Sequence, residues 1–321
     1  MSAPGPSGAG PVLLCPGQGS QSVGMGRSLA ERYPEARAAF EEADRVLGFP
    51  LAKLCFEGPE EELTRTENTQ PALLATSVAA WRVLASKGVA PAAAAGHSAG
   101  EYAAHVAAGT FSYEDGLRLI RARGEAMARA GDERPGAMAA VLGLSVEQIA
   151  EVLRAVDAPR DLAAANYNSP GQVVLSGTPE ALARGAEEAK RLGAKRVIPL
   201  QVSAAFHSPL MEAAARSLAE ALDRVMYRRS RFPVWANAWA RPVQDPEEAR
   251  TSLKEQLLSP VLWEQTMRAL IAGGSRRFVE IGNGRVLRGL AKSVDKELAL
   301  FGTQDPEELE SAAAAPAPAA G

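Results

Sequence analysis

The pentapeptide Gly96-His97-Ser98-Ala99-Gly100 constrains the fold of this chain more than any other segment. Small apolar residues precede it at 92–95, and residues 101–108 follow with helical character until Gly109. A serine flanked by glycines at a strand-to-helix turn is typical of a nucleophile elbow, where small neighbours allow close backbone contact and expose the hydroxyl. The alternative is a glycine-bearing turn with an incidental serine. Both interpretations predict a strand, a tight turn and a helix here.

The composition is that of an ordinary globular chain. Of 321 residues, 46% are hydrophobic and 23% are charged, which excludes disordered and collagen-like chains. The net charge of −3 gives no reason to expect binding to nucleic acid or to an anionic membrane surface. No apolar segment is long enough to span a bilayer, and the first ten residues lack the features of a secretory signal. Two cysteines and three histidines predict neither a disulfide framework nor a metal site, and free thiols favour a cytoplasmic location.

Hydrophobic periodicity divides the chain into a core and an inserted unit. In the core we expect strands at 11–15, 92–95 and 277–281, and helices at 25–47 with a break near Pro34, 71–87, 101–108, 113–130 and 211–225. In the insert we expect strands at 137–142, 173–176 and 194–203, and helices at 145–155 and 178–192. The order βαββαβ over residues 132–203 is typical of a ferredoxin-like subdomain. Residues 1–10 and the Ala/Pro-rich 306–321 are predicted to be disordered tails.

A serine nucleophile needs a base, and the chain contains three histidines. His97 adjoins Ser98 in the turn and would point elsewhere, while His105 lies in the following helix. His207 lies in a loop between an expected strand and an expected helix, where general bases are often held. From spacing alone, a catalytic and a structural role for His207 remain equal alternatives.

Two other segments are candidates for binding. The loop Pro16-Gly-Gln-Gly-Ser-Gln21 lacks the residues of a P-loop, but its glycines would let the Gln18 N–H act as an oxyanion donor. Arg123 lies on an expected helix, and an arginine beside an acylated serine would select acyl groups that carry a second carboxylate. A solvated helix arginine is the alternative interpretation.

Together these motifs resemble malonyl-CoA:acyl-carrier-protein transacylases and the related acyltransferase domains of polyketide synthases. The similarity extends from Pro16 to about Lys292. The matching segments are 16–21 with Gly24-Met-Gly26, Thr69-Gln-Pro-Ala72, Gly96-His-Ser-Ala-Gly-Glu-Tyr102, Arg123-Gly124, Gly136-Ala-Met138, Asn166-Tyr-Asn-Ser-Pro-Gly-Gln-Val-Val174, Phe206-His-Ser-Pro-Leu-Met211, Gln256 with Ser259-Pro260, and Glu280-Ile-Gly282 with Val286-Leu287. The resemblance implies an α/β hydrolase-like core with a parallel sheet, formed by residues 11–131 and 204–305, around the ferredoxin-like insert.

The resemblance also implies roles for the reacting groups. Ser98 would be the nucleophile that malonate acylates, and His207 would be its base and the acid for the leaving thiolate. The N–H groups of Gln18 and Ala99 would form the oxyanion hole, and the backbone carbonyl of Gln256 would orient the histidine. This would be a Ser–His dyad steered by a carbonyl.

For the acyl group, the resemblance implies that Arg123 pairs with the malonyl carboxylate and that Gln70 and Asn168 line the acyl pocket. Phe206 would fill the space that the 2-methyl branch of methylmalonate needs. Ala99 departs from the family pattern, which has leucine there in malonyl-selective members, and a smaller side chain could loosen selectivity.

The implied reaction is ping-pong transfer of malonate from malonyl-CoA to the phosphopantetheine thiol of acyl carrier protein, for fatty acid or polyketide synthesis. No metal or redox cofactor is expected, and we expect a monomer. The alternatives are a polyketide acyltransferase of relaxed selectivity, a thioesterase-like acyl hydrolase and a non-catalytic carrier-binding paralogue. Carrier proteins are typically acidic, so basic residues are candidate docking contacts, with scattered solvated charges as the equal alternative. These residues are Arg228, Arg229, Arg231, Arg276, Arg277, Arg285, Arg288 and Lys292.

Overall fold

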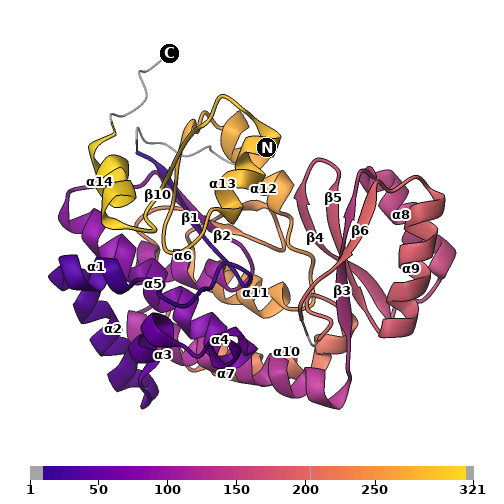
Figure 1. Cartoon of the computed structure of the whole chain (residues 1–321), viewed down its shortest axis with the longest axis horizontal. Coiled ribbons are helices and arrows are strands. Elements are labelled where there is room, and N and C mark those ends of the chain that lie inside the picture. The colour runs from indigo at the N-terminus through magenta and orange to yellow at the C-terminus, as the bar shows by residue number, and fades with distance from the viewer. Residues whose placement is uncertain (1–9, 203, 316–321) are drawn as a thin grey trace.

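The computed structural model describes residues 10–202 and 204–315 as two β-sheets with helices around them (Figure 1). The strands of the first sheet are β1 (Val12–Cys15), β2 (Ala93–Gly96), β7 (Val234–Ala236), β8 (Arg241–Val243), β9 (Arg277–Glu280) and β10 (Ala299–Gly302). Their order is β10-β9-β1-β2-β7-β8, and all neighbours pair in parallel except β7 and β8. The strands of the second sheet are β3 (Ala137–Leu142), β4 (Leu162–Ser169), β5 (Gln172–Gly177) and β6 (Arg196–Pro199). They are antiparallel in the order β4-β5-β3-β6, so the predicted fold class is confirmed.

Helices cover the first sheet and one side of the second. Those associated with the first sheet are α1 (Arg27–Arg32), α2 (Pro34–Leu47), α3 (Leu51–Glu57), α4 (Glu60–Thr64), α5 (Thr66–Ser86), α6 (Gly100–Ala108), α7 (Tyr113–Glu133), the 3₁₀ turn η1 (Pro209–Met211), α10 (Glu212–Asp223), α11 (Pro246–Gln256), α12 (Trp263–Ala272), α13 (Val286–Val294) and α14 (Pro306–Ala314). Those of the second sheet are α8 (Val146–Val156) and α9 (Pro179–Arg191). No helix among the described residues is both long and apolar enough to cross a membrane.

The centre of the first sheet is formed by β1 and β2, which pair in register from Val12 with Ala93 to Cys15 with Gly96. Both strands are buried along their whole length, which explains why they consist of uninterrupted apolar residues. Because the strands are parallel, their carboxyl ends meet at one edge of the sheet. The loop that begins at Pro16 therefore lies beside the turn at 97–100, and the N–H of His97 donates to the Cys15 carbonyl at 3.0 Å.

The helix at Pro71 differs from the prediction. Proline was expected at its start, but α5 begins at Thr66 and contains Pro71 in its interior. A proline has no N–H, so the carbonyl of Glu67, four residues earlier, loses its helical donor. The Arg121 guanidinium supplies a replacement through Nη1, 2.9 Å from that carbonyl oxygen. A tertiary contact from α7 thus lets the helix continue through the proline.

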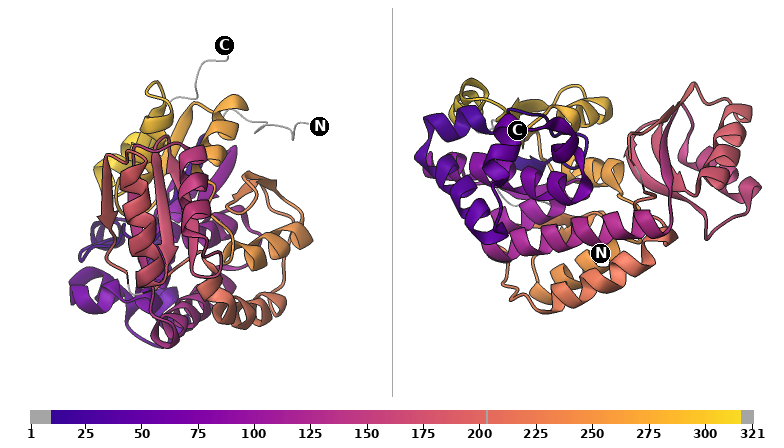
Figure 2. Two further views of the ribbon diagram at one scale, coloured as in Figure 1. Left: turned by 90° about the vertical axis from the view of Figure 1, so that its right-hand side faces the viewer. Right: turned by 60° about the horizontal axis from the view of Figure 1, so that its bottom comes forward.

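The insert forms its own sheet because its strands alternate between two apolar faces. On β3, Met138 and Ala140 pack into the main core, whereas Ala139 and Val141 pack with α8 and α9. Figure 1 shows these two helices on the outer side of the sheet, and in the right view of Figure 2 the long helix α7 extends from the core toward it. The second strand of the βαββαβ order, which was not located from the sequence, is β4.

The C-terminal part contains more structure than predicted. Strands β7 and β8 were missed, and β10 follows the strand that was expected to be last. The prediction of a disordered tail from residue 306 is wrong for 306–314, which form α14. Asp305 caps this helix, Leu309 is fully buried against the core, and Tyr33 donates to Glu310 at 2.7 Å. Packing of this one buried face stabilises the helix, even though the segment contains few large apolar side chains. Residues 1–9 and 316–321 of the two expected tails lie outside the described residues.

Candidate functional site

Ser98 lies in the tight turn between β2 and α6 and has a φ of 51°, in the left-handed region. Glycine is required on both sides of it. A Cβ atom on Gly96 would lie 2.0 Å from the carbonyl of Gly100, and one on Gly100 would lie 2.0 Å from the Cys15 oxygen. The close approach of β1, β2 and α6 therefore explains the Gly-x-Ser-x-Gly pattern and presents the serine hydroxyl at the edge of the sheet.

His207 meets Ser98 from a distant part of the chain. Its Nε2 lies 2.7 Å from Ser98 Oγ, and its Nδ1 lies 3.1 Å from the backbone oxygens of both Gln256 and Ser259. Carbonyl oxygens only accept, so Nδ1 carries the hydrogen and Nε2 is left to accept the serine proton. Of the two alternatives left open by the sequence, this geometry favours His207 as the base.

The other two histidines contact other groups. His97 Nε2 lies 2.8 Å from Asn168 Oδ1, and His105 Nδ1 lies 3.0 Å from the Thr110 hydroxyl. Neither one bonds to the serine.

Burial keeps His207 unprotonated. Desolvation first, and then the nearby Arg123 cation, lower its pKa to about 3, although the two carbonyls oppose the shift. A histidine that is neutral at physiological pH is ready to accept a proton.

Arg123 is fully buried on α7 and lies beside the serine. Its Nη2 donates to Ser98 Oγ and to Gln256 Oε1, both at 3.1 Å, and its Nη1 donates to Gln70 Oε1 at 2.7 Å. Within residues 10–202 and 204–315, no carboxylate lies within ion-pair distance of it, and its Nε has no hydrogen-bond partner. Its direct hydrogen bonds go to neutral oxygens. Burial is the larger effect and lowers the pKa of Arg123, and the buried Glu101 carboxyl raises that pKa only from beyond ion-pair distance. Such an arginine favours an anionic ligand at this position.

A cavity of about 290 Å³ opens at these residues, between the two sheets. Its lining comes from the β1–α1 loop, the serine turn, α7, the second sheet and the segment before η1. The lining residues are Gln18, Gly19, Gln21, Thr64, His97, Ser98, Ala99, Arg123, Met127, Met138, Asn166, Leu200, Gln201, Val202, Phe206 and His207.

Not every predicted pocket residue lies in this cavity. Gln18, Ala99, Arg123 and Phe206 do, but Gln70 and Asn168 do not. Both are buried behind it, where they hydrogen-bond Arg123 and His97 respectively, and their contact with the acyl group stays a prediction.

The backbone N–H groups of Gln18 and Ala99 remain available. Among the hydrogen bonds of the described residues, neither group donates to a protein acceptor. Both residues line the cavity beside Ser98, so each of these two unused donors belongs to a residue of its wall.

The roles of three polar groups of the site had not been predicted. The side chain of Gln256, predicted only for its carbonyl, donates to the Ser98 carbonyl at 3.0 Å and to Glu101 Oε2 at 2.7 Å. Asn237 Oδ1 accepts the Ser98 N–H at 2.7 Å, and the Asn237 N–H donates to Glu101 Oε2 at 3.1 Å. Ser259 supplies the second carbonyl to His207. Asn237 directly follows the short strand β7, and a polar residue at a strand end is the signal that could have identified it.

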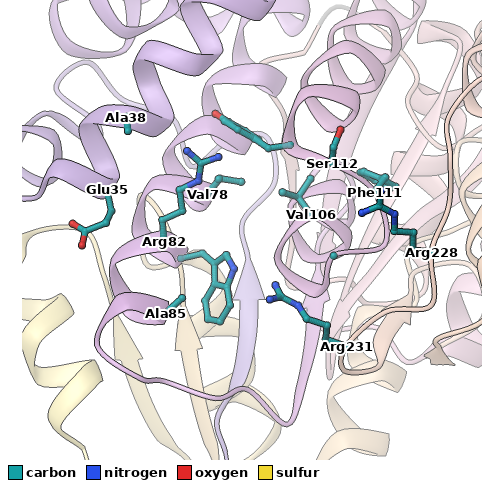
Figure 3. Close-up of a pocket in the computed structure, with 13 residues that line it drawn as sticks. Glu35, Ala38, Val78, Arg82, Ala85, Val106, Phe111, Ser112, Arg228 and Arg231 are labelled. Carbon is teal, nitrogen blue, oxygen red and sulfur yellow. The ribbon is translucent and has the colours of Figure 1, made fainter.

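A second cavity, of about 590 Å³, lies away from Ser98 between α2, α5 and the residues around Gly109 (Figure 3). It is larger than the first, but none of the predicted site residues lines it, so chemistry and not size locates the site. Arg228 and Arg231, two of the proposed docking contacts, line this cavity.

Three of the other docking candidates are buried or already paired. Arg277 is buried, and Arg285 and Arg288 form ion pairs with Glu308. These cations do not form a free basic face. Within residues 10–202 and 204–315, no group of three His, Cys, Asp or Glu side chains could hold a metal ion.

Comparisons with known proteins agree with this geometry. The model of the acyl transferase domain family matches residues 12–314. The malonyl CoA-acyl carrier protein transacylase of Bacillus subtilis is 46% identical, over 94% of this chain and 95% of its own length. That of Escherichia coli K12 is 40% identical, over 94% of this chain and 98% of its own length.

Solved structures agree as well. The malonyl-CoA:acyl carrier protein transacylase of Xanthomonas oryzae superimposes with a TM-score of 0.91 at 42% identity, over 95% of this chain and 98% of that one. A malonyl-transacylase solved in complex with its type II polyketide synthase acyl-carrier protein superimposes with a TM-score of 0.91 at 42% identity, over 94% and 98%. The chain therefore belongs to the acyl transferase domain family, within its group of malonyl CoA-acyl carrier protein transacylases.

Proposed function

We propose that this protein transfers a malonyl group from malonyl-CoA to the phosphopantetheine thiol of acyl carrier protein, through an ester on Ser98. The observation that carries the proposal is the buried Arg123, which forms no ion pair among the described residues and whose Nη2 lies 3.1 Å from the Ser98 hydroxyl oxygen. A hydrolase for simple esters has no use for a desolvated cation at this place, whereas a malonyl group supplies the missing carboxylate.

The steps follow from the contacts. His207 Nε2 takes the proton of Ser98 as the oxygen attacks the thioester carbonyl, and the Gln18 and Ala99 N–H groups stabilise the oxyanion. The thiolate of CoA leaves with the proton from His207, and the malonyl ester remains. The thiol of the carrier protein then gives up its proton to His207 and attacks the ester. The Ser98 oxygen leaves with that proton, which restores both the serine and the neutral histidine. This is ping-pong transfer.

The Gln256 and Ser259 carbonyls take the place of the acid of a triad. Each carbonyl oxygen lies 3.1 Å from His207 Nδ1 and accepts its hydrogen, and both stabilise the imidazolium while it carries the second proton. Each step exchanges one acyl bond for another at constant oxidation state, so we expect no cofactor besides the two substrates. All these groups come from one chain, which is consistent with an active monomer, and we expect cytoplasmic substrates of fatty acid or polyketide synthesis.

The test is intact-protein mass spectrometry after mixing with malonyl-CoA, with Ser98→Ala as the control. We expect a malonyl adduct on the wild type, none on Ser98→Ala, and loss of the adduct to added acyl carrier protein. Malonate released into solution in place of transfer would identify an acyl hydrolase. If neither an adduct nor free malonate formed, the proposed enzymatic activity would be refuted, and a non-catalytic carrier-binding paralogue would be favoured.

A further inference from the structure

Glu101 is a fully buried carboxyl group that the mechanism above does not use. It lies in the first turn of α6, three residues after Ser98. One of its oxygens, Oε2, accepts two hydrogen bonds, from Gln256 Nε2 at 2.7 Å and from the Asn237 N–H at 3.1 Å. These two donors belong to segments more than 130 residues away, at |i−j| of 155 and 136. A single oxygen thus joins the ends of α11 and β7 to the serine turn.

The same two residues hold the backbone of Ser98 on both sides. Asn237 Oδ1 accepts the Ser98 N–H at 2.7 Å, and Gln256 Nε2 donates to the Ser98 carbonyl at 3.0 Å. Asn237 Nδ2 also donates to the Gly96 carbonyl at 2.7 Å. A non-glycine residue in the left-handed region is strained, so its conformation persists only where the surroundings hold it.

Glu101 also determines which way the Gln256 amide faces. A carboxylate oxygen accepts, so the NH₂ end of the amide must face Glu101, and Oε1 then faces the Nη2 donor of Arg123 at 3.1 Å. The reversed amide would place an acceptor against Glu101 and a donor against Arg123. The carbonyl of this same residue holds His207.

We propose that Glu101 is a positioning residue for Ser98, because its Oε2 anchors the two residues whose side chains hold the serine backbone, through the Asn237 backbone N–H and the Gln256 amide, and orients Gln256 toward Arg123. The inference rests on the proposed function, because formation of the malonyl ester is one of its two readouts. The hydrogen bonds of Glu101 themselves do not depend on which acyl group reacts.

The role needs an acceptor and not a charge. Oε1 has no hydrogen-bond partner among the described residues, and its neighbour His105 Nε2 is 3.9 Å away. The other titratable groups facing Glu101 are Tyr102 and Arg123. Burial raises the pKa of Glu101 to about 7, and a proton on Oε1 leaves Oε2 free to accept. Glutamine at this position can therefore keep the contacts through its own oxygen.

The test compares Glu101→Met, which keeps the length and removes the acceptor, with Glu101→Gln. Glu280→Met is the matched control, because Glu280 is another buried glutamate whose carboxylate accepts two N–H groups, from Leu287 and Arg288. Each full-length variant is assayed below its melting temperature for single-turnover formation of the malonyl ester. A sulfonyl fluoride that labels the serine directly gives a second rate, which does not depend on the natural substrate.

We expect Glu101→Met to slow both reactions at least about tenfold, with KM for malonyl-CoA unchanged, because both hydrogen bonds accepted by Oε2 are lost and their buried donors are left unpaired. Glu101→Gln should remain within about twofold of the wild type at both pH 6 and pH 8. Glu280→Met should lower the melting temperature and leave both rates unchanged.

Three results would overturn the proposal: wild-type rates in Glu101→Met, an equal loss in a folded Glu101→Gln, or an equal loss in Glu280→Met. A wild type that forms no malonyl ester would refute the proposed function alone, since the sulfonyl fluoride rates would still decide the role of Glu101.

Discussion

Acylation of Ser98 should be almost independent of pH between 5 and 8, because His207 remains neutral over this range. Burial and the Arg123 cation lower the pKa of His207 to about 3. A histidine with the ordinary pKa of about 6.5 would be only about 3% neutral at pH 5, and the rate would fall about 30-fold. A histidine with a pKa of about 3 is still about 99% neutral there, so kcat/KM should change less than about twofold.

The assay measures kcat/KM for ester formation, which reports the pKa values of the free enzyme. Malonyl-pantetheine is the better donor, because the 3′-phosphate of CoA titrates near pH 6 and would add an inflection of its own. Samples quenched at each pH are quantified by intact-protein mass spectrometry. A decline with a midpoint near pH 6.5 would refute the argument that burial holds the base neutral.

The lowered pKa of His207 also makes the free energy of unfolding depend on pH, in a range where the rate of acylation does not. The pKa of His207 is lower in the folded protein than in the unfolded chain. Between these two pKa values the unfolded chain therefore binds a proton at His207 and the folded protein does not. The contribution is fully present above about pH 6.5 and is lost as the pH falls toward 3. At pH 5 the shift of 1.5 units from 6.5 amounts to about 2 kcal/mol of lost stability. Circular dichroism at each pH should therefore accompany the rates, so that unfolding is not mistaken for titration of the base.

Three further outcomes are expected. Arg123→Ala should lower kcat/KM for malonyl-CoA about 100-fold or more and spare acetyl-CoA, since a bidentate charged contact is lost; an unchanged ratio of the two donors would argue against the carboxylate clamp. Phe206→Ser should raise methylmalonyl relative to malonyl labelling about tenfold in competition, because room for one methyl group is worth that much; equal ratios before and after would remove Phe206 from selectivity. Leu309→Ala should lower the free energy of unfolding in urea by about 3 kcal/mol without changing acylation; a loss below 1 kcal/mol would mean that α14 does not stabilise the core.

The sequence predicted the fold where local rules decide it. The glycines around Ser98, the alternating strands of the insert and the capped helices α8 and α9 depend on neighbours a few residues apart. It failed where distant contacts decide. Helix α5 continues through Pro71 because Arg121 replaces a donor, and α14 is ordered because Leu309 finds a buried place. Neither contact has a signature in the segment itself.

The site divides in the same way. The Gly-x-Ser-x-Gly pattern by itself determined a serine on a tight turn, because only glycine fits against the backbone on each side. The pairing of that serine with His207 joins residues separated by 109 positions, and no local rule states such a distance. Only the tertiary structure showed that Arg123 forms no ion pair among the described residues and that Glu101, Asn237 and Gln256 together hold the serine. Burial, hydrogen bonding and pKa belong to groups brought together from separate segments, and these properties come into existence only when the chain is folded.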